Sequence, residues 1–325
     1  MDFKQIRNSE YKNFIDIVLS SDDKYVQHCT VLIASILLNN KSKYTYRFHI
    51  LDGGISNKNK FYIEKLRKIQ YFEIFYYEMD TYDFSFLPLN RENISVATYY
   101  RLEIINILPK DIEKVIYLDC DIVVDGDLAE LWETDVSEVY SGVVEDESSI
   151  KNSKKLGLQN YFNAGVLLLN LKKLRENNFQ DKWINYYENN QNIINLQDQD
   201  ILNGVFNNNV KWLSLKWNAN STIFAKAKYK HFYTNEDEFY TKQNRIIIHF
   251  TEKYKPWNHK SYHPLRKIYF KYLLKTPFKS KIKKYVIIKI KQFIHDIFSI
   301  TNQNFHKVIT IFWIRIKFPK SIKIN

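Results

Sequence analysis

The chain has 325 residues, of which 45% are hydrophobic and 26% charged, so it can bury a large core and has the composition of a soluble globular protein. Two cysteines, Cys29 and Cys120, exclude a disulfide framework, and without an apolar N-terminal signal segment we expect a reducing, cytoplasmic compartment. The net charge of +12 is uneven: 16 Lys and Arg follow residue 258 against the single acid Asp296, so totals of 48 basic and 36 acidic residues leave 32 and 35 before it.

The first part of the chain alternates between strand and helix patterns. An apolar run that ends in a polar turn predicts a strand over 14–23. The alternation continues with a helix over 26–40, a strand that begins at Tyr46 and is stopped by Gly53 and Gly54, a helix over 57–69 and a strand over 71–79. This order predicts an α/β fold with a mainly parallel sheet between helices, and such sheets bind ligands at the carboxyl ends of their strands.

Two common phosphate-binding loops are missing from the sequence. No Gly-x-Gly-x-x-Gly follows the first predicted strand, and the close pair Gly53-Gly54 follows the second. There is also no Gly-x-x-x-x-Gly-Lys-Ser/Thr segment. A dinucleotide-binding Rossmann enzyme is therefore disfavoured, and phosphates would have to be held in another way.

Two Asp-x-Asp pairs lie in the segment VIYLDCDIVVDGDLAELW. In the second pair, Asp127 is placed to cap a helix, with Glu130 as its capping-box partner. The first pair, Asp119 and Asp121, follows a buried strand and has no such explanation. Side chains at i and i+2 of an extended chain project to one side, where two carboxylates repel unless a cation lies between them. For an isolated pair, a turn cap beside a solvated Asp is the commoner reason.

The surrounding motifs resemble the GT-A glycosyltransferases of family eight, which include bacterial lipooligosaccharide α-galactosyltransferases, lipopolysaccharide glucosyl- and galactosyltransferases and glycogenin. Besides the acidic segment, the motifs in chain order are DIVLSSDDKY, FHILDGGIS, NISVATYYRL, YFNAGVLLLNLKK, NLQDQDILN and HFTEKYKPW. The resemblance covers roughly Asp16 to His259. It implies a Rossmann-like GT-A catalytic domain over 14–258 with a mixed, mainly parallel sheet.

The resemblance assigns most of these motifs to a UDP-sugar donor. It implies that Asp22 accepts a hydrogen bond from uracil, that Arg101 holds the sugar or diphosphate and that Lys255 neutralises the β-phosphate. Asp198 is assigned to the sugar and Gln199 to the β-face of the anomeric carbon. The other implied donor-binding residues are Asp23, Lys24, Asn93, Ile94, Thr98, Asp119, Cys120, Asp121, Asp146 and Asn163.

By the same resemblance, His249 joins Asp119 and Asp121 as the third metal ligand. Two carboxylates and one imidazole without thiolate favour Mn²⁺ or Mg²⁺ over Zn²⁺. The implied reaction is retaining transfer of galactose or glucose to a saccharide or glycolipid acceptor, by front-face attack because no strong nucleophile is evident. The chain departs from the family at Glu252, where many relatives carry Gly, which puts the diphosphate geometry of that loop in question.

Residues 259–325 form a basic tail in which cations alternate with aromatic and branched residues. Val286, Ile290, Phe293, Ile294 and Ile297 would share one face of a helix, and no run reaches the roughly 18 apolar residues that span a bilayer. We expect a helical, amphipathic membrane-association region that lies on the anionic inner face of the cell membrane. An acceptor such as a growing lipooligosaccharide or lipopolysaccharide core fits this location.

Other interpretations of the same residues remain open. Each motif taken alone has an ordinary structural role: a polar loop, a helix start, a turn into a core strand or a packed histidine. A sequence pI near 9.3 also fits a nucleic-acid-binding protein, but the basic charge is confined to the tail, so we expect no nucleic-acid partner. A metal-dependent nucleotide-sugar hydrolase would use Asp119 and Asp121 without needing an acceptor.

Overall fold

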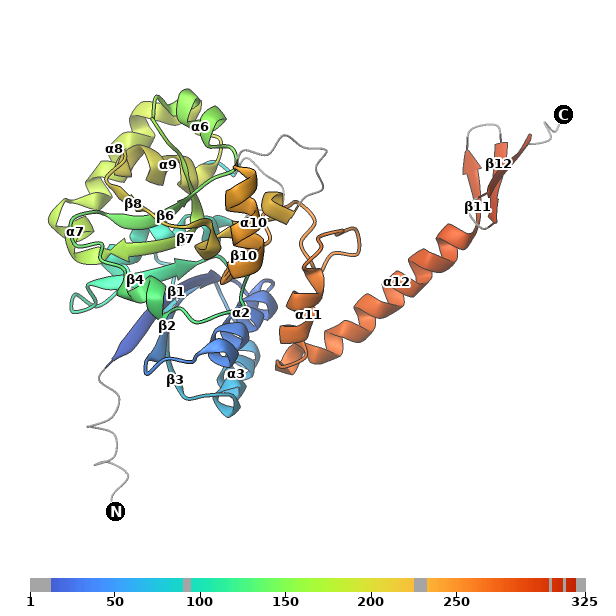
Figure 1. Ribbon diagram of the computed structural model, residues 1–325, viewed down its shortest axis with the longest axis horizontal. Coiled ribbons are helices and arrows are strands. Elements are labelled where there is room, and N and C mark those ends of the chain that lie inside the picture. Colours follow the sequence, from blue (N-terminus) through green and yellow to red (C-terminus); the bar gives the residue numbers. More distant parts are fainter. Residues whose placement is uncertain (1–12, 90–94, 225–232, 304–305, 312–313, 320–325) are drawn as a thin grey trace, which may run out of the picture.

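A computed structural model describes residues 13–89, 95–224, 233–303, 306–311 and 314–319. Its centre is a seven-stranded sheet with the order β3-β2-β1-β4-β7-β6-β8 (Figure 1). The strands are β1 (Phe14–Ser21), β2 (Thr45–Asp52), β3 (Phe72–Glu78), β4 (Lys114–Leu118), β6 (Ser141–Glu145), β7 (Phe162–Asn170) and β8 (Val210–Trp212). Only β7 runs antiparallel to its neighbours, so the expected mixed, mainly parallel sheet is confirmed.

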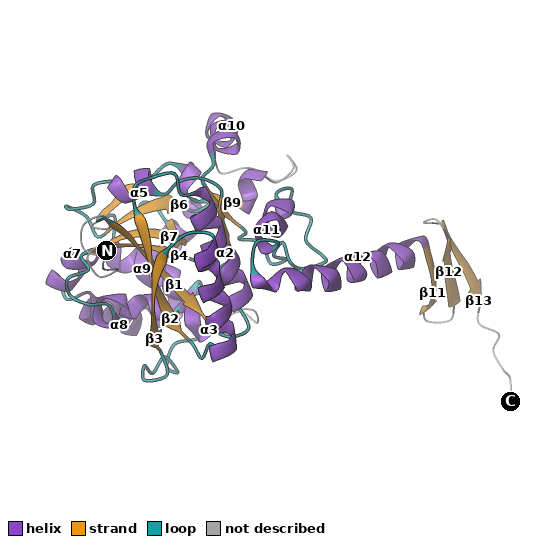
Figure 2. Cartoon of the chain, turned by 90° about the horizontal axis from the view of Figure 1, so that it is seen from below, coloured by secondary structure: helices purple, strands orange, loops and turns teal. Residues whose placement is uncertain are grey.

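Helices cover both faces of this sheet (Figure 2). One face carries α2 (Val26–Asn39), α3 (Asn57–Glu64), α5 (Ala129–Glu133) and α11 (Arg266–Leu273). The other carries α4 (Ile104–Ile107), α7 (Leu171–Glu176), α8 (Phe179–Asn190) and α9 (Gln197–Phe206). The remaining helices of the body are α6 (Ser149–Leu156), α10 (Asn235–Asn244) and short 3-10 turns over 65–68, 96–98, 100–103, 191–193, 215–217, 221–224 and 277–280.

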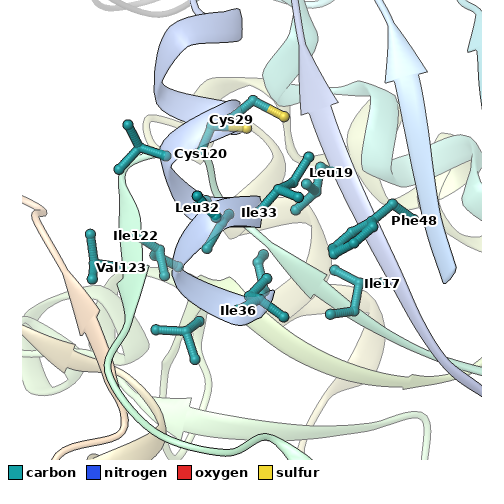
Figure 3. Packing of buried hydrophobic residues seen from close by; sticks show 14 of the residues in the cluster. Ile17, Leu19, Cys29, Leu32, Ile33, Ile36, Phe48, Cys120, Ile122 and Val123 are labelled. Carbon is teal, nitrogen blue, oxygen red and sulfur yellow. The ribbon is translucent and has the colours of Figure 1, made fainter. Parts of the chain in front are cut away.

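The alternation of side chains along the central strands explains why the sheet has two hydrophobic layers. Ile17 and Leu19 of β1 pack against α2, whereas Val18 between them faces the opposite layer. Figure 3 shows Ile17 and Leu19 beside Leu32 and Ile33 of α2. Because every strand at this position is covered on both sides, its sequence is an almost unbroken apolar run.

A second, smaller sheet joins strands from the C-terminal part of the body to β5 (Ile122–Val124), which follows the central strand β4 in the chain. It consists of β5, β10 (Ile247–His249) and β9 (Ala219–Asn220), in that order. β10 runs antiparallel to β5, with His249 opposite Ile122. Since β5 begins directly after Asp121, this pairing places His249 beside the first acidic pair.

The predicted strands and helices of the first 80 residues are confirmed, but two local predictions are wrong. The apolar run in YFNAGVLLLNLKK predicts a strand over 166–169, but β7 begins at Phe162, so Asn163 and Gly165 lie within it, next to a register shift between β6 and β7. The capping box does not form: Leu128 is the N-cap residue of α5, and Asp127 accepts from the backbone N–H groups of Ala129, the first residue of the helix, and of Lys41. Glu130 instead pairs with Lys216 at 2.6 Å, a partner remote in sequence.

The packed body continues past residue 258. On α11, Tyr269 and Tyr272 are each 1% exposed, and the Tyr272 hydroxyl bonds to Asn39 of α2 and to Asp125. This helix therefore belongs to the core, and the region that projects from the body begins near Lys281 (Figures 1 and 2).

The projecting region is helical only in its first half. It consists of α12 (Lys281–Ile297) and a three-stranded antiparallel sheet of β11 (Phe298–Gln303), β12 (His306–Ile311) and β13 (Ile314–Pro319). The prediction of a helical tail is thus wrong after Ile297, where alternating β-branched and aromatic residues favour strands. Within the described residues, no helix combines the length and the apolarity that a membrane span requires.

Candidate active site

Most of the predicted site residues gather at one edge of the central sheet, around a cleft of about 570 Å³. β1, β4 and β6 run in the same direction and end there, so Asp22, Asp119 and Asp146, which follow them, are brought together. β7 starts at the same edge because it runs the opposite way, and this adds Asn163. The N-terminal end of α9 adds Gln199.

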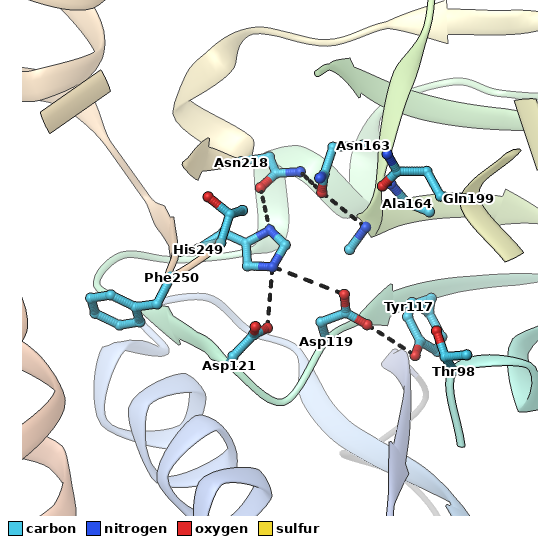
Figure 4. A network of polar contacts seen from close by, with 12 residues as sticks. Thr98, Tyr117, Asp119, Asp121, Asn163, Ala164, Gln199, Asn218, His249 and Phe250 are labelled. Atoms are coloured by element: carbon cyan, nitrogen blue, oxygen red, sulfur yellow. Dashed lines mark hydrogen bonds and ion pairs between the residues drawn. The ribbon is translucent and has the colours of Figure 1, made fainter. Parts of the chain in front are cut away.

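Asp119 and Asp121 converge on His249, as the resemblance implied. Nε2 of His249 lies 3.1 Å from Oδ1 of Asp121 and 3.9 Å from Oδ2 of Asp119 (Figure 4). One ligand atom from each residue lies within 4.8 Å of the other two. Cys120 lines the cleft between the two carboxylates, but its Sγ contacts the carbonyl oxygen of Ser20, so the thiol faces away from this centre.

A chain of side-chain amides sets the tautomer of His249 (Figure 4). The carboxylate of Asp146 can only accept, so Asn163 presents Nδ2 to it at 3.1 Å, and Oδ1 of Asn163 accepts from the N–H of Gly165 at 3.0 Å. Oδ1 of Asn163 also accepts from Nδ2 of Asn218 at 2.9 Å, which leaves Oδ1 of Asn218 to face Nδ1 of His249 at 2.9 Å. Nδ1 of His249 therefore carries the proton, an assignment that follows from the network.

This tautomer directs the lone pair of Nε2 toward the two carboxylates. Oδ1 of Asp121 is buried and accepts no hydrogen bond, although Nε2 of His249 lies 3.1 Å away. Three acceptors that face one another without a donor form an arrangement that a bound cation stabilises. The donor set therefore fits a divalent metal, with Asn218 and Asn163 as the outer residues that orient the imidazole.

Two side-chain cations border the acidic pair. Nη2 of Arg101 lies 2.7 Å from Oδ1 of Asp119, and Nζ of Lys255 lies 2.7 Å from Oδ2 of Asp121. Burial opposes the charged form of Asp121, but the Lys255 ammonium and His249 together hold the pKa of that carboxyl well below its usual value. Asp121 is therefore a carboxylate throughout the range in which proteins fold. Tyr117 completes the group, with its hydroxyl 3.2 Å from Oδ1 of Asp119.

Arg101 is buried between two carboxylates. Its Nε lies 3.0 Å from a carboxylate oxygen of Asp198, and its Cζ lies 4.3 Å from the centroid of the Tyr117 ring. The side chain of Arg101 is only 5% exposed. Asp198 is itself buried and accepts from the hydroxyl of Thr98. Burial raises the pKa of Asp198 to about 6, although Arg101 lowers it. The guanidinium thus links Asp119 of the acidic pair to Asp198 of α9.

Gln199 and Asp198 occupy the first turn of α9 but have different partners. Oε1 of Gln199 accepts from the N–H of Ala164 at 3.0 Å, and its Nε2 lies 3.5 Å from Asp146. The carboxamide is therefore held at the cleft wall, beside the carboxylate that ends the amide chain. It offers a dipole to the cleft and is a poor nucleophile.

The polar turn after β1 is divided between the cleft and the surface. Asp22 and Lys24 line the cleft together with Tyr25. Asp22 also accepts from the backbone N–H of Tyr25 at 2.8 Å, which shapes the turn. Asp23 does not join them: its carboxylate accepts from the backbone of Ser56 and from Asn59, so the structure separates it from the predicted donor site. Asn93 and Ile94 lie outside the described residues.

Several residues of the site carry no recognisable signal in the sequence. Asn218 lies in the unremarkable segment KWNANS, yet its amide connects His249 to Asn163. Glu147 lines the cleft next to Asp146, and burial together with that carboxylate raises its pKa to about 7. The partners of Asn218 are distant in sequence, as are Thr222 and His249 near Glu147, so only the fold could reveal these contacts.

Gly165 is required by the approach of β7 to the metal-binding group. A Cβ added at this position would overlap Cε1 of His249 and lie 2.8 Å from Oδ2 of Asp119. Both neighbours are held by other partners and cannot withdraw. We therefore expect Gly165→Ala to displace His249 and to weaken Mn²⁺ binding by at least about tenfold, the effect typical of disturbed outer residues.

The change in affinity can be measured by titrating Mn²⁺ against the purified protein. Gly142→Ala in the adjacent strand β6 is the matched control, because its Cβ would meet only apolar side chains at 3.2 Å or more. Equal Mn²⁺ affinities for Gly165→Ala and the wild-type protein would contradict the proposed close approach.

Comparison with known proteins agrees with this geometry. Residues 16–261 match the family described as Glycosyl transferase family 8. General stress protein A of Bacillus subtilis is 30% identical over 80% of this chain and 93% of its own length. Lipopolysaccharide 1,2-glucosyltransferase of Escherichia coli is 29% identical over 94% of this chain and 95% of its own.

Among solved structures, the galactosyltransferase LgtC in complex with donor and acceptor sugar analogues superposes with a TM-score of 0.71. It is 30% identical and covers 81% of this chain and 96% of its own. The matched residues include the whole cleft edge from β1 to His249. On the strength of the fold, the cleft and these similarities, the chain belongs to glycosyltransferase family 8.

Proposed function

We propose that this protein transfers a hexose, galactose or glucose, from a UDP-sugar to a saccharide acceptor with retention of the anomeric configuration. The observation that carries the proposal is the convergence of Asp119, Asp121 and His249 with the cations Arg101 and Lys255 in one cleft. The names of two similar proteins support it, since one is a lipopolysaccharide glucosyltransferase and the other a galactosyltransferase solved with donor and acceptor analogues.

Asp119, Asp121 and His249 would hold a divalent cation, for which we propose Mn²⁺ or Mg²⁺. The two carboxylates and the Nε2 lone pair form a hard donor set, and the nearby thiol of Cys120 is directed elsewhere. When bound, such an ion supplies Lewis-acid stabilisation of diphosphate oxygens.

The protein's own cations would stabilise the same negative charge. Lys255 and Arg101 each lie 2.7 Å from a carboxylate of the acidic pair, so both are adjacent to the place where the diphosphate would bind. Their charges are preorganised by the fold and would act on the departing UDP as the anomeric bond breaks. Asp22 and Lys24, at the end of β1, would contact the nucleoside side of the donor.

The sugar would lie on the side of Asp146, Asn163, Asp198 and Gln199. Asp198 is engaged by Arg101 and Thr98, and Gln199 is a carboxamide held by Ala164, so neither presents a free, strong nucleophile. We therefore favour front-face attack by the acceptor hydroxyl, with Gln199 stabilising the electron-poor anomeric carbon.

The donor can be identified with UDP-galactose and UDP-glucose in the presence of Mn²⁺ and truncated lipooligosaccharide acceptors. We expect the acceptor to accelerate UDP release from one donor by at least about tenfold, because a bound acceptor hydroxyl is held close to the anomeric carbon. UDP release at the same rate without acceptor would indicate a hydrolase. Absence of turnover together with salt-dependent binding of duplex DNA would favour the nucleic-acid alternative.

We propose further that α12 attaches the enzyme to the inner face of an anionic membrane, where a lipooligosaccharide or lipopolysaccharide acceptor would be available. Three apolar side chains of its predicted face are exposed: Val286 by 45%, Ile290 by 52% and Ile294 by 56%. They share a helix with lysines such as Lys281 and Lys291, a combination that suits an interface of apolar tails and anionic headgroups.

Replacing Ile290 and Ile294 together by Asp should abolish sedimentation with anionic vesicles. Inserting two carboxylates into the bilayer costs more free energy than the ~1 kcal/mol by which each nearby lysine favours binding to the anionic surface. The helix should therefore no longer bind the vesicles. Ile150→Asp is the control, because Ile150 is 71% exposed on the body, far from α12 in sequence. Retained vesicle binding in the double variant, or lost transfer to a soluble acceptor, would contradict the proposal.

A further inference from the structure

The guanidinium of Arg266 donates hydrogen bonds to three backbone carbonyls of the loop that follows Lys255. Arg266, at the start of α11, donates from Nη2 to the carbonyl oxygens of Pro256 at 3.0 Å and Asn258 at 3.2 Å. Its Nη1 donates to the carbonyl oxygen of Ser261 at 2.5 Å. Three carbonyl oxygens of one short segment therefore converge on Arg266, whose planar guanidinium can donate to several acceptors at once. Residues 256–261 are here called the Arg266 loop.

An aromatic stack holds the same loop from the side of α2. The Trp257 ring lies parallel to the imidazole of His28, with centroids 3.6 Å apart and an angle of 17°. It also contacts Tyr269 of α11 at 5.0 Å, and the Tyr269 hydroxyl lies 2.7 Å from Nδ1 of His28. Burial lowers the pKa of His28 to about 3, so this is a stack of neutral rings. The Arg266 loop is thus attached to two helices at once.

The extension also contributes to this attachment. Tyr285 of α12 lies over the Arg266 guanidinium at 5.1 Å, and its ring is 4.5 Å from that of Phe270. An aromatic face over a guanidinium stabilises the charge and shields it from water. Arg266 therefore contacts both the loop it holds and Tyr285 of the projecting helix.

Lys255 immediately precedes the Arg266 loop, and its carbonyl oxygen accepts from the backbone N–H of Asn258 in that loop at 2.8 Å. Its Nζ lies 2.7 Å from Asp121 and 2.6 Å from the carbonyl oxygen of Phe250, at the wall of the cleft. A lysine has a flexible four-carbon stem, so its ammonium is preorganised only if its backbone is held. None of the hydrogen bonds of Arg266 reaches the cleft itself.

We propose that Arg266 is a positioning residue that holds Lys255 in place for stabilising the leaving diphosphate, an inference that rests on the proposed function of Lys255. Arg266→Lys keeps the charge but cannot bond three carbonyls in one plane. We expect it to lower kcat for hexose transfer by at least about tenfold, since small misplacements of catalytic groups have large effects, while the KM for the acceptor stays unchanged.

Arg175 offers a matched control for a purely structural effect. Its guanidinium likewise donates to several backbone carbonyls, including those of Ile105, Leu108 and Ile112, but none of these residues lines the cleft. We expect Arg175→Lys and Arg266→Lys to lower the midpoint of urea unfolding similarly, and only Arg266→Lys to lower kcat. Equal kcat values for the two variants would overturn the proposal.

A double-mutant cycle with Lys255→Met tests whether Arg266 acts through Lys255. If it does, Arg266→Lys should change kcat by less than about twofold in the Lys255→Met background. The same loss in both backgrounds would mean that Arg266 acts independently, and would overturn the proposal.

The proposed function and this inference can fail separately. Transfer by the wild-type protein with unchanged kcat in Arg266→Lys would reject only the positioning role. If the wild-type protein does not transfer hexose, the proposed function fails, and calorimetry with UDP and Mn²⁺ then decides: weaker UDP binding in both Arg266→Lys and Lys255→Met supports the inference. UDP affinity that is unchanged by Arg266→Lys, or undetectable in the wild-type protein, overturns it.

Discussion

Asp121→Asn is expected to lower kcat for hexose transfer by at least about 1,000-fold, since a Lewis-acid metal contributes several kcal/mol and about 1.4 kcal/mol corresponds to each factor of ten. Asp121 is the member of the pair nearest to His249, and Lys255 together with His249 lowers the pKa of its carboxyl. The carboxamide keeps the size of the side chain but removes the negative charge. Steady-state transfer with Mn²⁺ measures the effect.

The second acidic pair supplies the control for that variant. Asp127 has the same spacing to Asp125 as Asp121 has to Asp119, but its carboxylate only accepts from the backbone of Ala129 and Lys41. Asp127→Asn should therefore leave kcat within about twofold, as for an ordinary surface site. If Asp121→Asn retained activity, or if chelation with EDTA left the wild-type rate unchanged, the metal assignment would be wrong.

Arg101→Met is expected to reduce both activity and stability. Arg101 is the shared partner of Asp119 and Asp198, and Asp198 is only 3% exposed. Removing one partner of a buried ion pair typically costs about 3–5 kcal/mol of unfolding free energy, because the remaining charge stays buried. Urea unfolding measures this loss, and Arg47→Met, which removes the partner of the buried Asp16, provides a comparison outside the cleft.

The loss of stability in Arg101→Met should grow with pH. Burial raises the pKa of Asp198 from 3.8 to about 6 while Arg101 opposes it, so without Arg101 the folded-state pKa rises further. A carboxyl with a raised pKa stabilises the fold fully only below its unfolded-state pKa, and that contribution is lost as the pH rises through the folded-state value. The deficit relative to the wild-type protein should therefore be larger at about pH 8 than at about pH 5. A pH-independent deficit would show that Asp198 does not titrate as described.

Local patterns in the sequence were sufficient for the central sheet and for the acidic pair. The apolar runs of β1 and β4 predicted buried strands, since strands covered on both faces have no polar alternation. The spacing of Asp119 and Asp121 placed both carboxylates on one side of the chain. The order of motifs then implied the family, which the match over 16–261 shows.

The same kind of reasoning failed where the partner of a residue is remote. The Asp23 carboxylate bonds to Ser56 and Asn59 and does not line the cleft, and Glu130 pairs with Lys216 instead of closing a capping box. The strands after α12 also lay beyond a prediction based on helical spacing alone.

By itself the sequence determined the α/β alternation, the strand that presents Asp119 and Asp121, and the basic character of the C-terminal region, because each depends on residues a few positions apart. Only the tertiary structure decided that Asn163 and Asn218 orient His249, and that Arg266 holds the loop behind Lys255. Those contacts join segments far apart in the chain. Their physical basis is the meeting of strand ends at one sheet edge, where buried polar groups must find hydrogen-bond partners.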